Sequence, residues 1–418
     1  MMLHLEKSLQ DLFEDVGEAM KLRSSYWEKF QQSGLPSKKE ENWKYTDIRS
    51  LYKKYGIDKL QAECNCQEEF CSLVKLNLDD SNYNIIVYDG SIMHDDVAQK
   101  GVKLSAITPK LSENVTNESE LVSLNQAASV SGISLEVMDD VVLDKPVVIS
   151  YVQDAYNHRS VMNYRNSIHF GQNAKGMIYE RFINLTEHNS ALNIRSDFDL
   201  EAGASCQFDR DQGQNETSLL LTYHCEINLK EAAKFSSFHL VSNSALTRYD
   251  FHVNLNGKEA LFDADGIYIL SAKAHLDYHF YVNHLASYTQ SDVNFRGVVG
   301  GDARAVFNAK AMVGEGLCGI KAMQNNRNLQ LTKTSEINTK PELEIYSDDV
   351  VCSHGATVGQ LDKSALFYLR SRGIDKKDAE RLLMEGFTKE VVLALTRDQK
   401  KIEHYMEILS EYLQNIGS

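Results

Sequence analysis

The feature that most constrains the fold is a long series of short β-rich segments that begins near residue 132. Segments such as "KPVVISYV", "GMIYERFI" and "SLLLTYHCEINL" alternate in polarity and are separated by turns of small residues. The turns "NAKG" at 173, "EAGAS" at 201, "KEAAK" at 230 and "NGKEA" at 256 recur roughly every 27–30 residues. This spacing is typical of stacked structural units, and it predicts a parallel β-helix.

Two other all-β architectures bear on this prediction. A sandwich or jelly roll also contains many short strands, so this alternative stays open on the pattern alone. A left-handed hexapeptide β-helix is disfavoured, because a strict six-residue apolar period is absent from the sequence. The parallel β-helix is preferred, because strand-rich segments continue for over 200 residues with few long loops.

Helical periodicity flanks the β-rich region on both sides. Near the end of the chain, Asp362 and Asp375 are predicted helix N-caps, and Gly373 a left-handed helix stop between them. Near the start, one apolar stripe recurs at helical spacing. We expect a mainly β fold with an N-terminal helical and mixed domain over 1–130, a β-helix core over 131–358 and a C-terminal helical domain over 359–418. The N-terminal stripe consists of Leu5, Leu9, Leu12, Phe13, Val16 and Met20.

Composition restricts which compartments and which binding partners we expect. The formal net charge of −15 over 418 residues disfavours binding to nucleic acid or to an anionic membrane surface, since both require a basic face. The first residues lack the apolar core of a signal peptide, and no apolar run approaches the ~18 residues of a membrane helix. Seven cysteines, an odd number, indicate reduced thiols rather than a disulfide framework. We therefore expect a cytoplasmic protein.

The stretch "DDVVCSHGATVG" contains the strongest candidate site residues, Cys352 and His354. Side chains two residues apart in an extended strand point to the same face, so this thiol and imidazole could contact one metal ion. A buried thiol beside a hydrogen-bonded histidine is the structural alternative. A third possibility is a nucleophile activated by the neighbouring imidazole. Spacing alone leaves all three open.

Other reactive side chains give weaker signals. Cys64, Cys66 and Cys71 match no metal-binding spacing, and we expect incidental surface sequence. Asp263, Asp265 and Asp277 raise the possibility of a carbohydrate-active β-helix enzyme, which would need paired carboxylates. Histidines and cysteines of the β-rich region could line a polar internal column, or be satisfied core and surface residues. They are His224, His239, His252, His275, His279, His284, Cys206, Cys225 and Cys318.

Two longer stretches carry a family resemblance. Residues 339–374, "TKPELEIYSDDVVCSHGATVGQLDKSALFYLRSRGI", resemble the C-terminal signature of the SufB/SufD family of iron–sulfur cluster assembly proteins. Residues 40–48, "EENWKYTDI", resemble a stretch of the SufD branch. The stretch "NNRNLQLTKTSE" at 325–336 has no cysteine where SufB-type scaffolds have one, and "CSHGAT" also departs from the SufB pattern. A cluster-holding SufB-like scaffold is thus the alternative within the family.

The resemblance implies a fold and a function. It implies a right-handed parallel β-helix between helical terminal domains, in a non-catalytic SufD-type scaffold subunit of a SufBCD complex. The implied partners are a SufB-like paralogue, a SufC-like ATPase and, indirectly, a SufS/SufE-type sulfur donor, with a homodimer plausible for the isolated chain. A transient iron–sulfur cluster, or iron, is expected at the interface with SufB, and help with iron acquisition is a further expectation.

The resemblance also assigns roles to residues of this sequence. His354 is implied as an interface ligand of the metal or cluster, with Cys352 beside it. The helix–glycine–helix stretch after residue 363 is implied as the docking site of the ATPase. We expect the docking surface to include Leu366, Arg370, Arg372, Leu382, Leu383 and Phe387.

Overall fold

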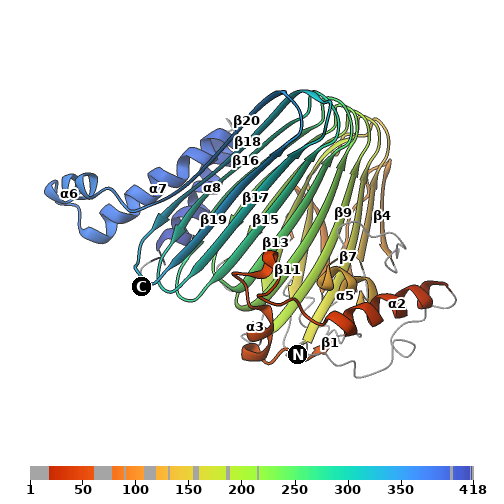
Figure 1. Cartoon of the computed structure of the whole chain (residues 1–418), viewed down its shortest axis with the longest axis horizontal. Helices are drawn as coiled ribbons and strands as arrows, with labels where there is room; N and C mark the ends of the chain where they lie inside the picture. Colours follow the sequence, from red (N-terminus) through yellow and green to blue (C-terminus); the bar gives the residue numbers. More distant parts are fainter. Residues whose placement is uncertain are drawn as a thin grey trace.

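The computed structural model describes residues 18–60, 78–88, 91–107, 119–129, 132–153, 160–184, 189–213, 216–395, 399–414 and 416. These residues form a parallel β-solenoid of about seven turns, with helices at both ends of the chain (Figure 1). The predicted mainly β fold, a parallel β-helix flanked by helices, is confirmed. The predicted stripe from Leu5 to Val16 and the cysteines at 64, 66 and 71 lie outside the described residues.

The chain builds two sheets by alternating between them in every turn of the solenoid. Sheet A runs in the order β19 (Glu336–Ile345), β17 (Arg304–Val313), β15 (His275–His284), β13 (Ser244–Leu255), β11 (Glu216–Leu229), β9 (Ser190–Leu200), β7 (Ser160–Phe170), β5 (Gly132–Val137) and β4 (Val102–Ile107), with β1 (Lys59–Leu60) beside β7. Sheet B runs in the order β20 (Asp349–Gly359), β18 (Cys318–Gln330), β16 (Gln290–Val299), β14 (Leu261–Leu270), β12 (Lys234–Val241), β10 (Ser205–Gln212), β8 (Lys175–Asn184), β6 (Val147–Gln153), β2 (Tyr83–Tyr88) and β3 (Ser91–Asp95).

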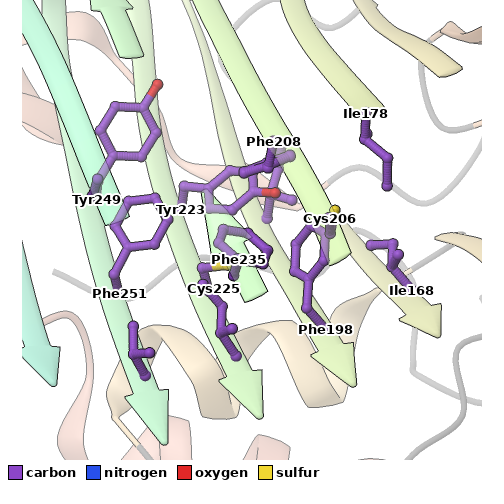
Figure 2. Close-up of a cluster of buried hydrophobic side chains, with 14 of the residues drawn as sticks. Ile168, Ile178, Phe198, Cys206, Phe208, Tyr223, Cys225, Phe235, Tyr249 and Phe251 are labelled. Carbon is purple, nitrogen blue, oxygen red and sulfur yellow. The ribbon is translucent and has the colours of Figure 1, made fainter. Parts of the chain in front are cut away.

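The core lies between the two sheets, where every second side chain of each strand points inward. Because consecutive strands of a sheet pair in register, inward side chains stack into columns along the solenoid. Phe208 and Phe198 meet across the core with ring centres 4.9 Å apart. Cys206 and Cys225 lie among these aromatic rings (Figure 2). Both thiols are therefore core side chains.

One corner of the solenoid explains the recurring turns of the sequence. Asn173, Gly203 and Ala232 have φ of 55°, 71° and 55°, the left-handed conformation that turns the chain within one residue. Their N–H groups donate to the carbonyl oxygens of Ala202, Glu231 and Lys258 in the next turn, at 2.8–3.0 Å. The small residues at this spacing thus form a stacked, hydrogen-bonded corner.

The N-terminal helices cover part of the outer face of sheet A. Helix α2 (Glu18–Ser33) is tied to α5 (Glu120–Ala128) by Arg23, whose Nη1 donates to the carbonyl oxygens of Ala127 and Ser129 at 3.1 Å. Apolar residues of α5 pack on β7 and β9, in a cluster that also includes outward residues of β11 and β13. This cluster is separate from the core between the sheets.

The "EENWKYTDI" segment, which contains η1 (Glu41–Trp43) and leads into α3 (Ile48–Tyr55), anchors on the same face. The Trp43 ring lies 3.9 Å from the guanidinium carbon of Arg248, and Thr46 donates to Oδ2 of Asp277 at 2.5 Å. Arg248 also pairs with Asp277 at 2.6 Å. The described contacts give this motif a structural role in docking the N-terminal segment.

The C-terminal helices are α6 (Lys363–Ser371), α7 (Lys376–Leu395) and α8 (Gln399–Gln414). Asp362 Oδ1 accepts from the Ser364 N–H at 2.7 Å, and Asp375 Oδ1 accepts from the Asp378 N–H at 3.0 Å. Gly373 has φ of 89°. The three predicted helix boundaries are confirmed. No helix among the described residues has both the length and the apolar composition to cross a membrane.

Candidate functional site

The two ends of the solenoid differ in how their last strands are paired. At the N-terminal end, the last strands, β4 and β3, pair antiparallel with β5 and β2. At the C-terminal end, β19 pairs with β17 and β20 pairs with β18, and the other edge of each strand has no strand beside it among the described residues. We call this pair of strands the open edge. Unpaired strand edges are sites of chain association.

Cys352 and His354 lie on β20 at positions that continue two columns of the core. Cys352 is in register with Ala322, and His354 with Gln324, both of β18. Ala322 and Gln324 are 0% and 5% exposed. The two candidate ligands therefore share the inward face, as their spacing predicts, but no further turn covers them.

The last turn leaves the two side chains in different surroundings. His354 is exposed, and Cys352 is half-buried. Burial raises the pKa of the Cys352 thiol, and a hydrogen bond from the backbone of Ala322 lowers it by less. No group of three or more His, Cys, Asp or Glu side chains in the described part of the chain is arranged to hold a metal ion.

Exposed apolar side chains accompany the two candidate ligands on the open edge. Val351 and Val358 of β20 are 58% and 47% exposed. Ile345 ends β19, and Tyr346 follows it, with exposures of 38% and 54%. Apolar side chains gathered on unpaired strands are typical of a surface that a partner covers. Spacing in the sequence did not single out these residues.

Helix α6 extends away from the solenoid, whereas α8 and much of α7 pack on the outer face of sheet B (Figure 1). Of the predicted ATPase-docking residues, Arg370, Arg372 and Leu382 are exposed, whereas Leu366 and Leu383 are half-buried. The structure adds two neighbours that the sequence reading omitted, Phe367 and Tyr368 of α6, which are 75% and 57% exposed. Their position in the sequence could have indicated them, because both lie between Leu366 and Arg370 on the predicted docking helix.

Phe387 differs from the other predicted docking residues, because it contacts the solenoid. Arg296 of β16 lies against its ring at 4.9 Å and donates to its carbonyl oxygen. Arg296 also pairs with the Glu390 carboxylate of α7. We call this set of contacts the Arg296 clamp. Between the clamp and β20 lies a cleft of about 580 Å³, lined in part by Arg327 and Ser353.

The remaining histidine and aspartate candidates separate into different places. His239 and His284 point into the core, where His239 lies 3.0 Å from the Tyr278 hydroxyl. The other four, His224, His252, His275 and His279, lie on the outer face of sheet A. Of these six histidines, only His239 and His284 could therefore belong to a polar column inside the solenoid.

The three aspartates do not converge. Asp277 of sheet A pairs with Arg248, whereas Asp263 and Asp265 lie on β14 of sheet B. Burial raises the pKa of both Asp263 and Asp265 to about 6. Asp277 therefore lies on a different sheet from Asp263 and Asp265, and the three carboxylates do not form one site.

The protein is thus a parallel β-solenoid with an open final turn. This turn carries a Cys–His pair, and a helical extension follows it. Residues 151–387 match the family described as SUF system FeS cluster assembly, SufBD core domain. Residues 4–149 match the SufBD protein N-terminal region. The chain belongs to the SufBD family of iron–sulfur cluster assembly proteins.

Similar proteins indicate the SufD-like branch of this family. The iron–sulfur cluster assembly protein SufD of Escherichia coli K12 is 26% identical over 374 residues, which cover 88% of this chain and 87% of the relative. SufD of Bacillus subtilis 168 is 24% identical and covers 84% and 83%. The chloroplastic protein ABCI7 of Arabidopsis thaliana is 22% identical and covers 93% and 86%.

Proposed function

We propose that this chain is the SufD-type scaffold subunit of a SufBCD complex and performs no catalytic turnover itself. The open edge pairs with a SufB-like paralogue, and the helical extension binds a SufC-like ATPase. Cys352 and His354 then face the interface at which an iron–sulfur cluster is assembled. Sulfur reaches this interface from a SufS/SufE-type donor through the paralogue.

The observation that carries the proposal is the position of the Cys–His pair on the last turn. Its two columns are buried in every strand of sheet B from β10 to β18. A partner that stacks on β19 and β20 would continue these columns and enclose Cys352 and His354. Two ligands on one chain leave room for ligands from that partner.

The chemistry of the pair suits iron as cargo. A thiolate and a neutral imidazole are both ligands that iron accepts. Because burial raises the pKa of Cys352, its thiol stays protonated at neutral pH until a metal ion displaces the proton.

The Arg296 clamp supports a mechanical link between the ATPase and the interface. Helix α7 is fixed to β16, two strands away from β20 in sheet B. A movement of the helices imposed by the ATPase would therefore be transmitted to the sheet that ends in the Cys–His pair. The cleft between α7 and β20 provides space for such a movement.

Anaerobic co-purification tests the proposal. The chain is expressed with the SufB-like and SufC-like proteins of the same organism, and iron and acid-labile sulfide are measured per complex. We expect Cys352→Ser/His354→Ala to assemble but to lose most of its iron, while His404→Ala on the exposed side of α8 keeps it. Full iron content in an intact double-variant complex would contradict the metal role. If the double variant fails to assemble, the single variants separate interface packing from metal binding.

A further inference from the structure

Three basic side chains lie side by side on the outer face of sheet A, far from the open edge in strand order. Arg165 of β7 is in register with Arg195 of β9, which is in register with His224 of β11. Neighbouring strands are about 4.8 Å apart, so the three side chains form one row. Their exposures are 7%, 3% and 8%. The row is therefore almost completely removed from solvent.

Each member of the row has one nitrogen atom without a hydrogen-bond partner among the described residues. These atoms are Nη1 of Arg165, Nη1 of Arg195 and Nε2 of His224. A buried donor without an acceptor is unfavourable, because it has lost its hydrogen bonds to water. Three such atoms on neighbouring strands are unusual among buried groups, and they show that no described residue supplies a partner to these atoms of the row.

The acidic side chains around the row are already engaged. Asp197 accepts from Arg165 at 3.2 Å and from Arg195 at 2.8 Å, so one carboxylate is shared by two guanidinium groups. Asp250 accepts from Nε and Nη2 of Arg248 at 2.9 and 2.8 Å. Glu226 accepts from Asn254, on the side away from the row. Asp197 is thus shared between the two arginines of the row, which lie beside His224.

A cavity of about 230 Å³ opens at the end of the row that His224 occupies. It lies between sheet A and the docked N-terminal segment, and we call it the histidine pocket. A water molecule takes about 30 Å³ of liquid volume, so the pocket has room for a small organic anion. Its lining includes Trp43, Thr222, His224, Asp250, His252 and Tyr281.

Two imidazoles, those of His224 and His252, line the histidine pocket. The ring of His224 lies 4.9 Å from that of His252, which stacks on Tyr281 at 4.6 Å. Burial, His252 and the arginines at 195, 248 and 165 lower the pKa of His224, in that order. The same arginines make the pocket unfavourable for a metal cation. A neutral imidazole with its proton on Nε2 can still donate one hydrogen bond to an anion.

We propose that the histidine pocket binds a small oxyanion, a phosphate or a carboxylate group, through His224 with the charge of Arg195 behind it. The anion supplies the hydrogen-bond partner that His224 Nε2 lacks among the described residues. It also bridges sheet A and the N-terminal segment at Trp43. The site is independent of the open edge and does not rest on the proposed function.

Thermal unfolding of the full chain tests the site. The midpoint is measured in sodium phosphate, sodium succinate and sodium chloride at equal ionic strength. We expect one of the first two to raise the midpoint by about 2 °C or more relative to chloride in the wild type. His224→Gln should abolish this difference, and the matched variant His404→Gln should keep it. The phosphate and succinate arms distinguish a phosphate group from a carboxylate group.

Two control experiments could contradict anion binding in the histidine pocket. Phosphate also stabilises proteins by exclusion from their surface, so an equal rise in wild type and His224→Gln would overturn the site. If His224→Gln does not fold, wild-type crystals soaked in selenate provide the decision. An anomalous peak within hydrogen-bond distance of His224 Nε2 supports the site, and density elsewhere or none contradicts it.

Discussion

Two cysteines occupy the same column of the solenoid and have opposite surroundings. Cys206 of β10 is 1% exposed, with Phe235 of the next strand in register beside it. Cys352 ends the same column at β20, with nothing stacked beyond it among the described residues. Burial raises the pKa of both thiols, and far more at Cys206. Position along the stack, rather than residue type, therefore separates a core thiol from a site thiol.

The largest expected effect lies deep in the buried turns. Arg210 and Glu180 are both 0% exposed and form an ion pair at 2.7 Å. Because Arg210→Met leaves a buried carboxylate without its partner, the free energy of unfolding should fall by about 3–5 kcal/mol in urea titrations. Glu180→Gln/Arg210→Met should recover most of this loss. Lys230→Met, in the exposed pair with Glu201, should cost less than about 1 kcal/mol.

A second pair of variants compares two positions of one column directly. Phe262 of β14 is 0% exposed and lies three strands before Cys352 in sheet B. Phe262→Ala should lower the free energy of unfolding by ~3–4 kcal/mol through the cavity it leaves. Cys352→Ala should lower it by less than about 1 kcal/mol in the isolated chain. Equal losses for the two variants would show that the last turn is as enclosed as the earlier ones.

The outer face of sheet B gives a smaller effect of opposite sign. Burial and repulsion by Asp292 raise the pKa of Asp263 to about 6, above its unfolded value of 3.8. The folded state thus binds this proton more tightly, so stability is lost as pH rises from about 4 to 6. Asp263→Asn should gain about 1–2 kcal/mol at pH 7.5 and little at pH 4. Urea titrations at both pH values check this, and a loss at pH 7.5 would contradict it.

The smallest effect on stability is expected in the helical extension. Phe367 and Tyr368 are exposed on α6, so Phe367→Asp/Tyr368→Asp should change the free energy of unfolding by less than about 0.5 kcal/mol. The same variant should weaken binding of the SufC-like ATPase at least about tenfold in a titration. Phe387→Ala provides the contrast, because it removes packing against Arg296 and should destabilise the chain. Unchanged ATPase binding by the α6 variant would place the docking surface elsewhere.

The sequence allowed the fold and part of the site to be predicted for local reasons. The small residues of the solenoid corner recur because each turn needs a left-handed residue there, as at Asn173 and Gly203. Asp362 and Gly373 mark helix ends through contacts within a few residues. Cys352 and His354 share a face because any strand alternates its side chains. Each of these signals is complete within a short stretch of chain.

Features that depend on distant contacts could not be predicted in this way. Arg296 contacts Phe387 across 91 positions, and nothing near either residue indicates that they meet. The row of Arg165, Arg195 and His224 exists only because strands some 30 residues apart are in register. The exposure of Cys352 likewise depends on where the stack of strands ends, which the local sequence does not reveal.

Alkylation of cysteines, followed by mass spectrometry, tests the central claim most directly. The isolated chain and its complex with the SufB-like and SufC-like proteins are treated with iodoacetamide at pH 8.5, with Cys206 as an internal standard. We predict that Cys352 is modified in the isolated chain and protected at least about tenfold in the complex, while Cys206 is unmodified in both. Equal modification of Cys352 in the two samples would contradict the assignment of the open edge as the partner interface.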